Sequence, residues 1–200
     1  MKTKILSLLF AAAFAPLLSA AVENGDDAPA FILTTMKGKE VSLSDYEGET
    51  VVLEWVNPGC PFVRKFYDEG HMGKFQKKAE EMGVVWLAIN STNPGHRDYL
   101  TPKESKKWAK KHGFAAKWLM DADGTVGKAY GAKTTPHMFI ISPEGKVVYQ
   151  GAIDSIRDAN PGSIGEATNY VMEALEALDQ GKAVPDARTR PYGCSVKYKS

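Results

Sequence analysis

The sequence predicts an α/β fold with a central mixed β-sheet flanked by helices. Two continuous apolar runs, residues 51–56 and 84–89, have the composition of buried parallel strands. Segments with helix-capping residues and helical apolar spacing separate these runs from later strands. Two strands around a Pro-Glu-Gly turn, residues 137–142 and 146–152, predict an antiparallel hairpin in the same sheet. At 200 residues with 44% apolar content, the chain is long enough for one sizeable core.

The N-terminus has the pattern of a secretory signal peptide. Lys2 and Lys4 precede an apolar stretch, residues 5–18, that is short for a membrane span, and small residues follow at 19–21. An uncleaved membrane anchor or a lipoprotein is the alternative. The predicted division is a signal peptide at 1–20, a folded domain at 21–181 and an extended C-terminal tail at 182–200. Export implies a secreted or periplasmic protein in an oxidising compartment, where disulfides persist, with no membrane contact after cleavage.

The first half of the folded domain begins with a β-hairpin and continues into the core strands. Strands at 31–34 and 40–43 flank Met36-Lys37-Gly38-Lys39, a turn signal. After the strand at 51–56, a helix is predicted to start behind Cys60 and end near Glu81. Gly70 and Gly73 predict a break within it, because glycine weakens helix interiors.

The second half is predicted from caps and short apolar runs. Thr101-Pro102-Lys103-Glu104 is a capping box with proline at the first helical position, and Gly113 stops that helix. A short strand at 118–120 and a short helix at 126–130 follow. Ser163-Ile164-Gly165-Glu166 is predicted to cap the last helix, which ends at Gly181. The net charge of +1 implies no nucleic-acid partner.

The strand at 51–56 leads to a cysteine in a turn. Asn57-Pro58-Gly59 breaks the strand, Cys60 follows, and Pro61 suits the first position of a helix because it needs no amide donor there. Unpaired N–H groups and the helix dipole favour a thiolate at such a position. The pattern therefore predicts a reactive Cys60; a buried structural thiol is the alternative.

A second feature, far along the chain, matches this one. Thr135-Pro136 directly precedes the strand at 137–142, and a proline that opens a strand is a candidate cis peptide. With these two features the sequence resembles the thioredoxin superfamily, in which a cysteine at a helix N-terminus faces a cis-proline loop. The resemblance implies a thioredoxin-like fold, with Cys60 as the nucleophile and Pro136, Thr135 and Pro61 beside the substrate groove.

The resemblance is closer to one branch, the peroxiredoxin-like redoxins related to AhpC/TSA, of the PRX-like-1 type. It covers nearly the whole chain from Asp27 onward and implies an exported thiol oxidoreductase with antioxidant chemistry. The motifs that carry it are Asn57-Pro58-Gly59-Cys60-Pro61-Phe62-Val63-Arg64-Lys65, Tyr130-Gly131-Ala132, residues 145–154, and the tail Pro191-Tyr192-Gly193-Cys194-Ser195-Val196-Lys197-Tyr198.

Departures from the family narrow the chemistry. Val63 stands where thioredoxins carry the second cysteine, so a local dithiol mechanism is impossible. Typical peroxiredoxins have a threonine three residues and a proline seven residues before the reactive cysteine, whereas Asn57 and Leu53 stand there here. Asn57 still offers a side-chain donor, and Arg64 is a candidate to stabilise a thiolate or a leaving oxygen.

Cys194 is the one other cysteine, so it is the candidate resolving thiol. It would release a mixed disulfide or condense with an oxidised Cys60. Two substrate classes stay open: a peroxide, or a protein or small-molecule disulfide, with an unknown reductant. No cofactor and no metal are predicted.

The alternative is a non-enzymatic module in which Cys60 and Cys194 form a permanent bridge. Closing so long a loop is worth about 4–5 kcal/mol in the chain-entropy model. In this alternative His137 and Met138 would join Cys60 in handling copper; otherwise His137 is a candidate base. Alternation along a strand would point His137 and Met138 to opposite faces, which argues against the copper site.

Overall fold

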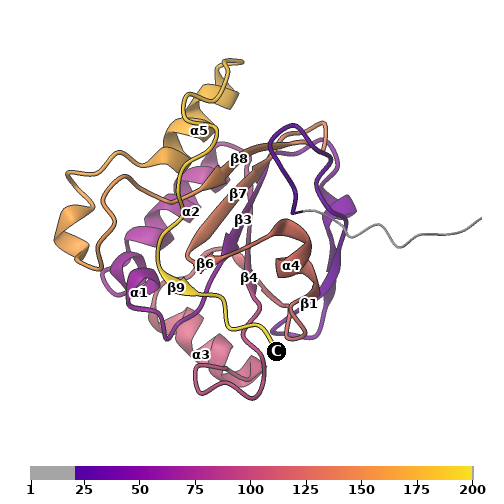
Figure 1. Cartoon of the computed structure of the whole chain (residues 1–200), viewed down its shortest axis with the longest axis vertical. Coiled ribbons are helices and arrows are strands. Elements are labelled where there is room, and N and C mark those ends of the chain that lie inside the picture. The colour runs from indigo at the N-terminus through magenta and orange to yellow at the C-terminus, as the bar shows by residue number, and fades with distance from the viewer. Residues whose placement is uncertain (1–20, 200) are drawn as a thin grey trace, which may run out of the picture.

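The computed structural model describes residues 21–199. The predicted signal peptide at 1–20 lies outside the described residues. Figure 1 shows a twisted sheet with helices packed against it and an extended C-terminal segment that crosses the sheet in front. No helix within residues 21–199 is long and apolar enough to cross a membrane.

Seven strands form the main sheet in the order β2-β1-β5-β4-β3-β7-β8. The central strands β3, β4 and β5 are parallel to one another, and the outer strands join them in antiparallel pairs. The mixed sheet that the apolar runs predicted is therefore present. The strands are β1 Ile32–Thr35, β2 Glu40–Ser42, β3 Val51–Trp55, β4 Val85–Asn90, β5 Lys117–Met120, β7 His137–Ile141 and β8 Val147–Gly151.

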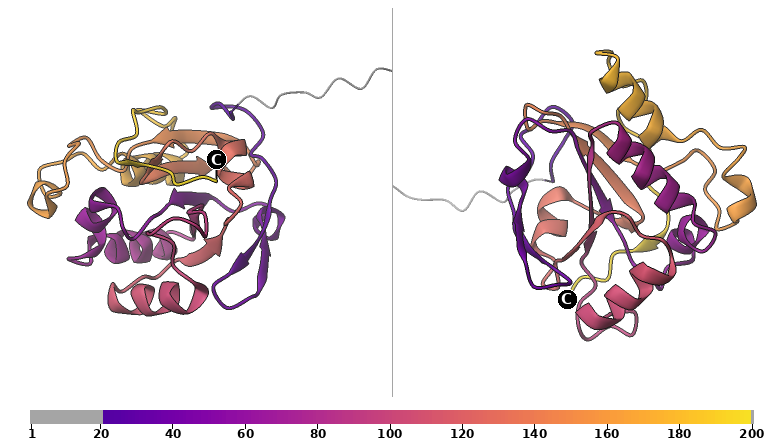
Figure 2. Two further views of the ribbon diagram at one scale, coloured as in Figure 1. Left: turned by 60° about the horizontal axis from the view of Figure 1, so that its bottom comes forward. Right: turned by 180° about the vertical axis from the view of Figure 1, so that it is seen from behind.

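Helices cover both faces of this sheet. One core cluster lies between the sheet and α1, α2, α3 and α5, and a second lies on the face that carries α4. The view from behind in Figure 2 shows α2 and α3 on the first of these faces. The helices are α1 Pro61–Tyr67, α2 His71–Glu81, α3 Pro102–Lys111, α4 Thr125–Tyr130 and α5 Tyr170–Asp179, with short 3₁₀ turns η1 Leu43–Tyr46 and η2 Pro161–Ser163.

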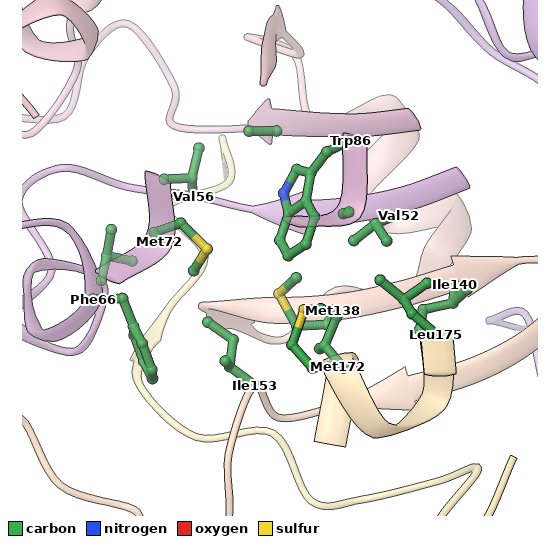
Figure 3. Close-up of a cluster of buried hydrophobic side chains, with 14 of the residues drawn as sticks. Val52, Val56, Phe66, Met72, Trp86, Met138, Ile140, Ile153, Met172 and Leu175 are labelled. Carbon is green, nitrogen blue, oxygen red and sulfur yellow. The ribbon is translucent and has the colours of Figure 1, made fainter. Parts of the chain in front are cut away.

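The first cluster is built from alternate strand residues and the apolar faces of the helices. Figure 3 shows Trp86 of β4 and Met138 of β7 directed toward Met72 of α2 and Leu175 of α5. All four side chains are at most 5% exposed. Burial of this apolar surface fixes α1, and with it the first residue of the candidate site, against the sheet.

The break predicted in the helix after Cys60 is confirmed. Gly70 has φ +73°, a left-handed conformation that glycine adopts without strain, and it separates α1 from α2. The capping box of α3 is also present, since the Thr101 side chain accepts the Glu104 N–H while the Glu104 carboxylate accepts the Thr101 N–H.

The predicted start of the last helix is wrong. Helix α5 begins at Tyr170 and is capped by Asn169, whose side-chain oxygen accepts the Met172 N–H at 3.0 Å. Ser163 instead belongs to η2, and its hydroxyl donates to Asp158 Oδ1 at 2.8 Å. The chain is still non-helical after Ser163, since Asn169 pairs with Asp154 in a β-bridge and the Thr168 carbonyl accepts the Ser155 N–H, so 163–166 is not the helix N-terminus.

The C-terminal tail is extended, as predicted, but part of it also forms a strand. Residues Cys194–Ser195 (β9) pair in antiparallel fashion with Thr134–Thr135 (β6) in a separate two-stranded sheet. In Figure 1 the tail descends from α5, passes beside β6 and ends near α4. The tail therefore reaches the predicted cis-proline loop.

The cap of α5 gives a first prediction. Asn169→Ala should lower the free energy of unfolding by about 1 kcal/mol, because the Met172 N–H loses its partner. Asn169→Asp, which keeps an acceptor at the same position, should stay close to wild type. Urea unfolding of the three proteins measures the difference; equal stability of Asn169→Ala and wild type would contradict this assignment of the cap.

Candidate functional site

Cys60 lies where β3 gives way to α1. It is the N-cap residue of α1, Pro61 is the first helical residue, and the Cys60 N–H donates to the Asn57 carbonyl at 3.0 Å. The strand-turn-cysteine-helix arrangement predicted from the sequence is confirmed. The Cys60 side chain is only 1% exposed, so the thiol lies beneath other parts of the chain.

The loop at Pro136 provides the group that faces this thiol. The Thr135–Pro136 peptide bond is cis, as predicted. The Cys60 thiol donates to the Thr135 carbonyl oxygen at an Sγ–O distance of 3.0 Å. Two segments 75 residues apart in the sequence therefore meet at one thiol.

Cys194 is brought to the same point by strand pairing. In the register of β6 and β9, Cys194 is the partner of Thr135, whose carbonyl accepts the Cys60 thiol. Both cysteines are free thiols in the structure. Burial, a hydrogen bond with Cys60 and the charge of Cys60 together raise the pKa of Cys194 to about 12. Cys60, Thr135 and Cys194 thus form one contiguous site.

Gly193 allows this close approach. It has φ +135°, and a Cβ at this position would collide with the carbonyl oxygen of Thr135. The colliding atoms belong to the backbone of the cis-proline loop, so they have little freedom to move away. The Pro-Tyr-Gly-Cys motif therefore needs glycine immediately before the second cysteine.

Two buried polar atoms beside Cys60 have no partner among the described residues. The Asn57 side-chain oxygen accepts the Gly59 N–H at 2.8 Å, which leaves the amide Nδ2 unpaired. The hydroxyl of Thr135 is also buried and unpaired. A buried, unpaired polar group is costly, and such groups are frequent at functional sites.

The structure does not bring Arg64 to the thiol. Its side chain is 58% exposed, and its guanidinium pairs with Asp68, four residues further along the chain, at 2.9 Å. Both Nε and Nη2 of Arg64 contact that carboxylate. A role for Arg64 at Cys60 would require it to leave this pair.

The side chain of His137 lies on the opposite face of the sheet from Cys60. Its ring packs against Phe139, a member of the second cluster, whereas Met138 and Cys60 belong to the first. The alternation predicted for residues 137 and 138 is therefore present. Nδ1 of His137 accepts the Lys133 N–H at 3.2 Å. Burial, and secondarily the charge of Lys133, lowers the pKa of His137 to about 3, so the ring is neutral near pH 7.

The positions of Cys60 and His137 argue against a shared copper site. Within residues 21–199 no three side chains of His, Cys, Asp or Glu gather closely enough to hold a metal ion. The donors proposed for copper, Cys60 and His137, are directed to different core clusters.

Asp98 is a site residue that the sequence did not indicate. Its carboxylate lies over Gly59, since a Cβ on Gly59 would come within 2.5–2.9 Å of three carboxyl atoms. Its negative charge also contributes to the raised pKa of Cys194. Asp98 comes from the loop after β4, and no local pattern in that loop points to the cysteines.

Glu54 is a second missed residue, buried in β3 six positions before Cys60. Its carboxyl group accepts from the hydroxyl of Tyr67 and from Nε1 of Trp86, both at 2.9 Å. Its hydrogen-bond donors are neutral groups, and within residues 21–199 no cation bonds to it. Burial outweighs these hydrogen bonds and raises the pKa of Glu54 to about 7. The sequence does contain a signal for this residue, because Glu54 is the one charged residue in the apolar run at 51–56.

Comparison with known proteins agrees with this geometry. Residues 24–150 match the model of the AhpC/TSA family. The thiol-disulfide oxidoreductase ResA of Geobacillus thermodenitrificans (strain NG80-2) is 30% identical over 154 residues, which cover 74% of this chain and 83% of that protein. The chain therefore belongs to the AhpC/TSA family.

Solved structures resemble the fold. A hypothetical protein from Sinorhizobium meliloti 1021 has a TM-score of 0.80 at 27% identity, with 91% of this chain and 98% of that chain covered. A putative thiol:disulfide interchange protein DsbE from Chlorobium tepidum has a TM-score of 0.54 at 27% identity, with coverage of 65% and 85%. The predicted thioredoxin-like fold is confirmed, and the likeness to ResA supports a thiol-disulfide oxidoreductase.

Glu54 gives a second prediction. Because the folded chain holds this proton up to about pH 7, while an unfolded glutamic acid releases it near 4.5, the free energy of unfolding should fall as pH rises through this window. The loss should be on the order of 3 kcal/mol. Glu54→Gln stays neutral at every pH and keeps an acceptor for Tyr67 and Trp86. Its free energy of unfolding should therefore lack this decrease with pH.

Denaturant unfolding at pH 5 and pH 8 gives the free energy of unfolding of wild type and of Glu54→Gln. Relative to the variant, wild type should be less stable at pH 8 than at pH 5. Glu80→Gln, at an exposed position of α2, is the matched control and should follow wild type. A constant difference between wild type and Glu54→Gln at the two pH values would contradict the raised pKa.

Proposed function

We propose that this member of the AhpC/TSA family is an exported thiol-disulfide oxidoreductase, with Cys60 as the nucleophile and Cys194 as the resolving thiol. One observation carries the proposal. Cys194 pairs across a strand ladder with Thr135, the residue whose carbonyl accepts the Cys60 thiol at 3.0 Å. A resolving thiol must be able to reach the first cysteine, and this pairing keeps it there.

The first step is attack by the Cys60 thiolate on a substrate disulfide. A bond forms between Cys60 Sγ and one substrate sulfur, the substrate S–S bond breaks, and the other substrate sulfur leaves as a thiolate. The raised pKa of Cys194 supports this order of events, since a thiol that stays protonated does not compete as the first nucleophile.

The second step releases the substrate. Cys194 gives its proton to the substrate thiolate released in the first step and attacks Cys60 Sγ, so that the Cys60–Cys194 disulfide forms and the second substrate sulfur leaves as a thiolate. The substrate gains two electrons and the protein loses two. A dithiol reductant then restores both cysteines by the same kind of exchange.

The surrounding residues have positioning roles in this proposal. In this proposal Thr135, Pro136 and Pro61 line the substrate groove, and the carbonyl of Thr135, which accepts the Cys60 thiol, orients it. The unpaired amide of Asn57 is a buried donor close to the first residue of α1. It is suited to a sulfur or oxygen atom that carries negative charge during exchange.

A disulfide substrate has more support than a peroxide. The threonine and proline that typical peroxiredoxins place before the reactive cysteine are replaced by Asn57 and Leu53, and Leu53 is wholly buried within β3. The similarity to ResA, a protein named as a thiol-disulfide oxidoreductase, favours the same substrate class. The assay of disulfide reduction should therefore be accompanied by an assay of peroxide consumption, so that the two activities can be compared.

The two cysteines give the third prediction. Cys60→Ser should abolish reduction of a model protein disulfide, because no thiolate is left to attack it. Cys194→Ser should stop turnover after the first step and accumulate a mixed disulfide between Cys60 and the substrate. Non-reducing electrophoresis and intact-mass measurement detect that species.

Thiol trapping in glutathione buffers supplies the control. A reduction potential in the range of known oxidoreductases, between about −120 and −270 mV, agrees with a bridge that opens and closes. A potential below about −300 mV would mark the bridge as a permanent staple and would overturn the proposal. Wild-type turnover by both serine variants would do the same.

A further inference from the structure

A buried ionic cluster lies on the helix that carries Cys60. Lys65 of α1 has a side chain with 0% exposure. Its ammonium group contacts Asp154 Oδ2 at 2.9 Å, the Ile156 carbonyl at 2.8 Å, Asp158 Oδ1 at 3.1 Å and the Tyr192 hydroxyl at 3.3 Å. The Tyr192 hydroxyl in turn donates to Asp154 Oδ1. Three distant segments of the chain therefore meet at one ammonium group.

The cluster is complete in its hydrogen bonds. A lysine has three N–H donors, and here oxygen acceptors surround the group while Asp154, 2% exposed, balances its charge. Burial and the neighbouring Asp154 hold the pKa of Tyr192 well above its usual value, so its hydroxyl remains a donor. A satisfied buried network of this kind has one low-energy arrangement.

Its members are close in sequence to both cysteines. Lys65 follows Cys60 by five residues in α1, and Tyr192 precedes Cys194 by two residues in the tail. The rings of Phe62 and Tyr192 also meet edge to face, with centroids 5.8 Å apart. Tyr192 therefore connects the tail directly to the helix that begins at Cys60.

The other tail anchors near Cys194 are attached elsewhere. The Val196 N–H donates to the Lys133 carbonyl, the Asn93 N–H donates to the Lys197 carbonyl, and the Tyr198 hydroxyl donates to the Ala132 carbonyl at 2.8 Å. These bonds fix the tail to the loops before β6 and after β4. Within residues 190–199, Tyr192 supplies the hydrogen bond and the ring contact to residues inside α1, namely Lys65 and Phe62.

We propose that Tyr192, held by the buried Lys65–Asp154 pair, is a positioning residue that fixes the Cys194 thiol at Cys60. The inference rests on the proposed function, because it assigns a purpose to the resolving thiol. The anchoring of Tyr192 raises the effective concentration of the Cys194 thiol at Cys60, as a short rigid linker does for two binding groups that it connects. In the reduced protein the tail also covers Cys60, which is 1% exposed, so the tail must open before a substrate disulfide reaches the thiol.

Tyr192→Phe is the sharpest test, because it removes one hydroxyl and leaves the ion pair and the ring contact with Phe62 in place. We expect the equilibrium constant for Cys60–Cys194 disulfide formation in glutathione buffers to fall about tenfold. That factor corresponds to about 1.4 kcal/mol, the order of one hydrogen bond to a charged group. Thiol trapping followed by mass measurement gives the constant.

A second readout separates positioning from a general loss of stability. In a Cys194→Ser background, Tyr192→Phe should speed alkylation of Cys60 by about the same tenfold, because the covering tail opens more often. Gly193→Ala is the positive control, since its methyl group would collide with the Thr135 carbonyl and must displace the tail. Tyr130→Phe is the matched negative control, as it removes a buried tyrosine bond to the Pro29 carbonyl in the other core cluster.

The outcomes are distinct. If Tyr192→Phe melts at a lower temperature but keeps the wild-type equilibrium constant and alkylation rate, Tyr192 is merely structural and the inference is overturned. If the wild type forms no Cys60–Cys194 disulfide in any buffer, the proposed function itself fails. Should Tyr192→Phe not fold, Phe62→Leu replaces it, because it removes the ring contact that ties Tyr192 to α1 and leaves the buried ion pair intact, and both shifts are expected in the same direction.

Discussion

The candidate site depends on one short backbone pairing, between Thr135 of β6 and Cys194 of β9. Thr135 faces the tail through this ladder and accepts the Cys60 thiol through its carbonyl oxygen. Two paired residues on each strand make too few hydrogen bonds to be stable alone in water. The pairing therefore requires that the tail be fixed on either side of it, by the contacts of Tyr192 before it and of Val196 after it.

The tail gains this fixation by contributing to the core. Val196 belongs to the second hydrophobic cluster, while Cys194 packs against the first. Tyr198 lies over the helix α4, where the absence of side chains at Gly124 and Gly127 makes room for its ring. A segment that reads as a polar, proline-containing tail is thus held by side chains at intervals of two residues, which lie on one side of an extended chain. The cluster that they contact changes along the tail, from the first at Cys194 to the second at Val196 and Tyr198.

Local patterns predicted most of the fold, and the cysteine-turn-helix and cis-proline features of the site. Apolar runs, capping boxes and glycine breaks act within a few residues, so β3, β4, α3 and the break at Gly70 follow from them. The start of α5 was missed because the contacts that keep residues 168–169 extended come from Asp154 and Ser155, outside the local pattern. The burial of Lys65 was missed for the same kind of reason, since its partners come from residues 154–158 and 192.

Two buried ionisable groups flank Cys60, and the chain accommodates them differently. Glu54 is surrounded by neutral donors, so burial shifts its pKa toward neutrality and the carboxyl group gives up its charge readily. Lys65 instead has a carboxylate partner and full hydrogen bonding. A buried ion pair adds little stability compared with apolar side chains of the same volume, but its directional bonds allow few arrangements. This pair joins α1 to the loop after β8, and Tyr192 of the tail donates to its carboxylate, so the proposed positioning of Cys194 depends on directional bonds more than on apolar burial.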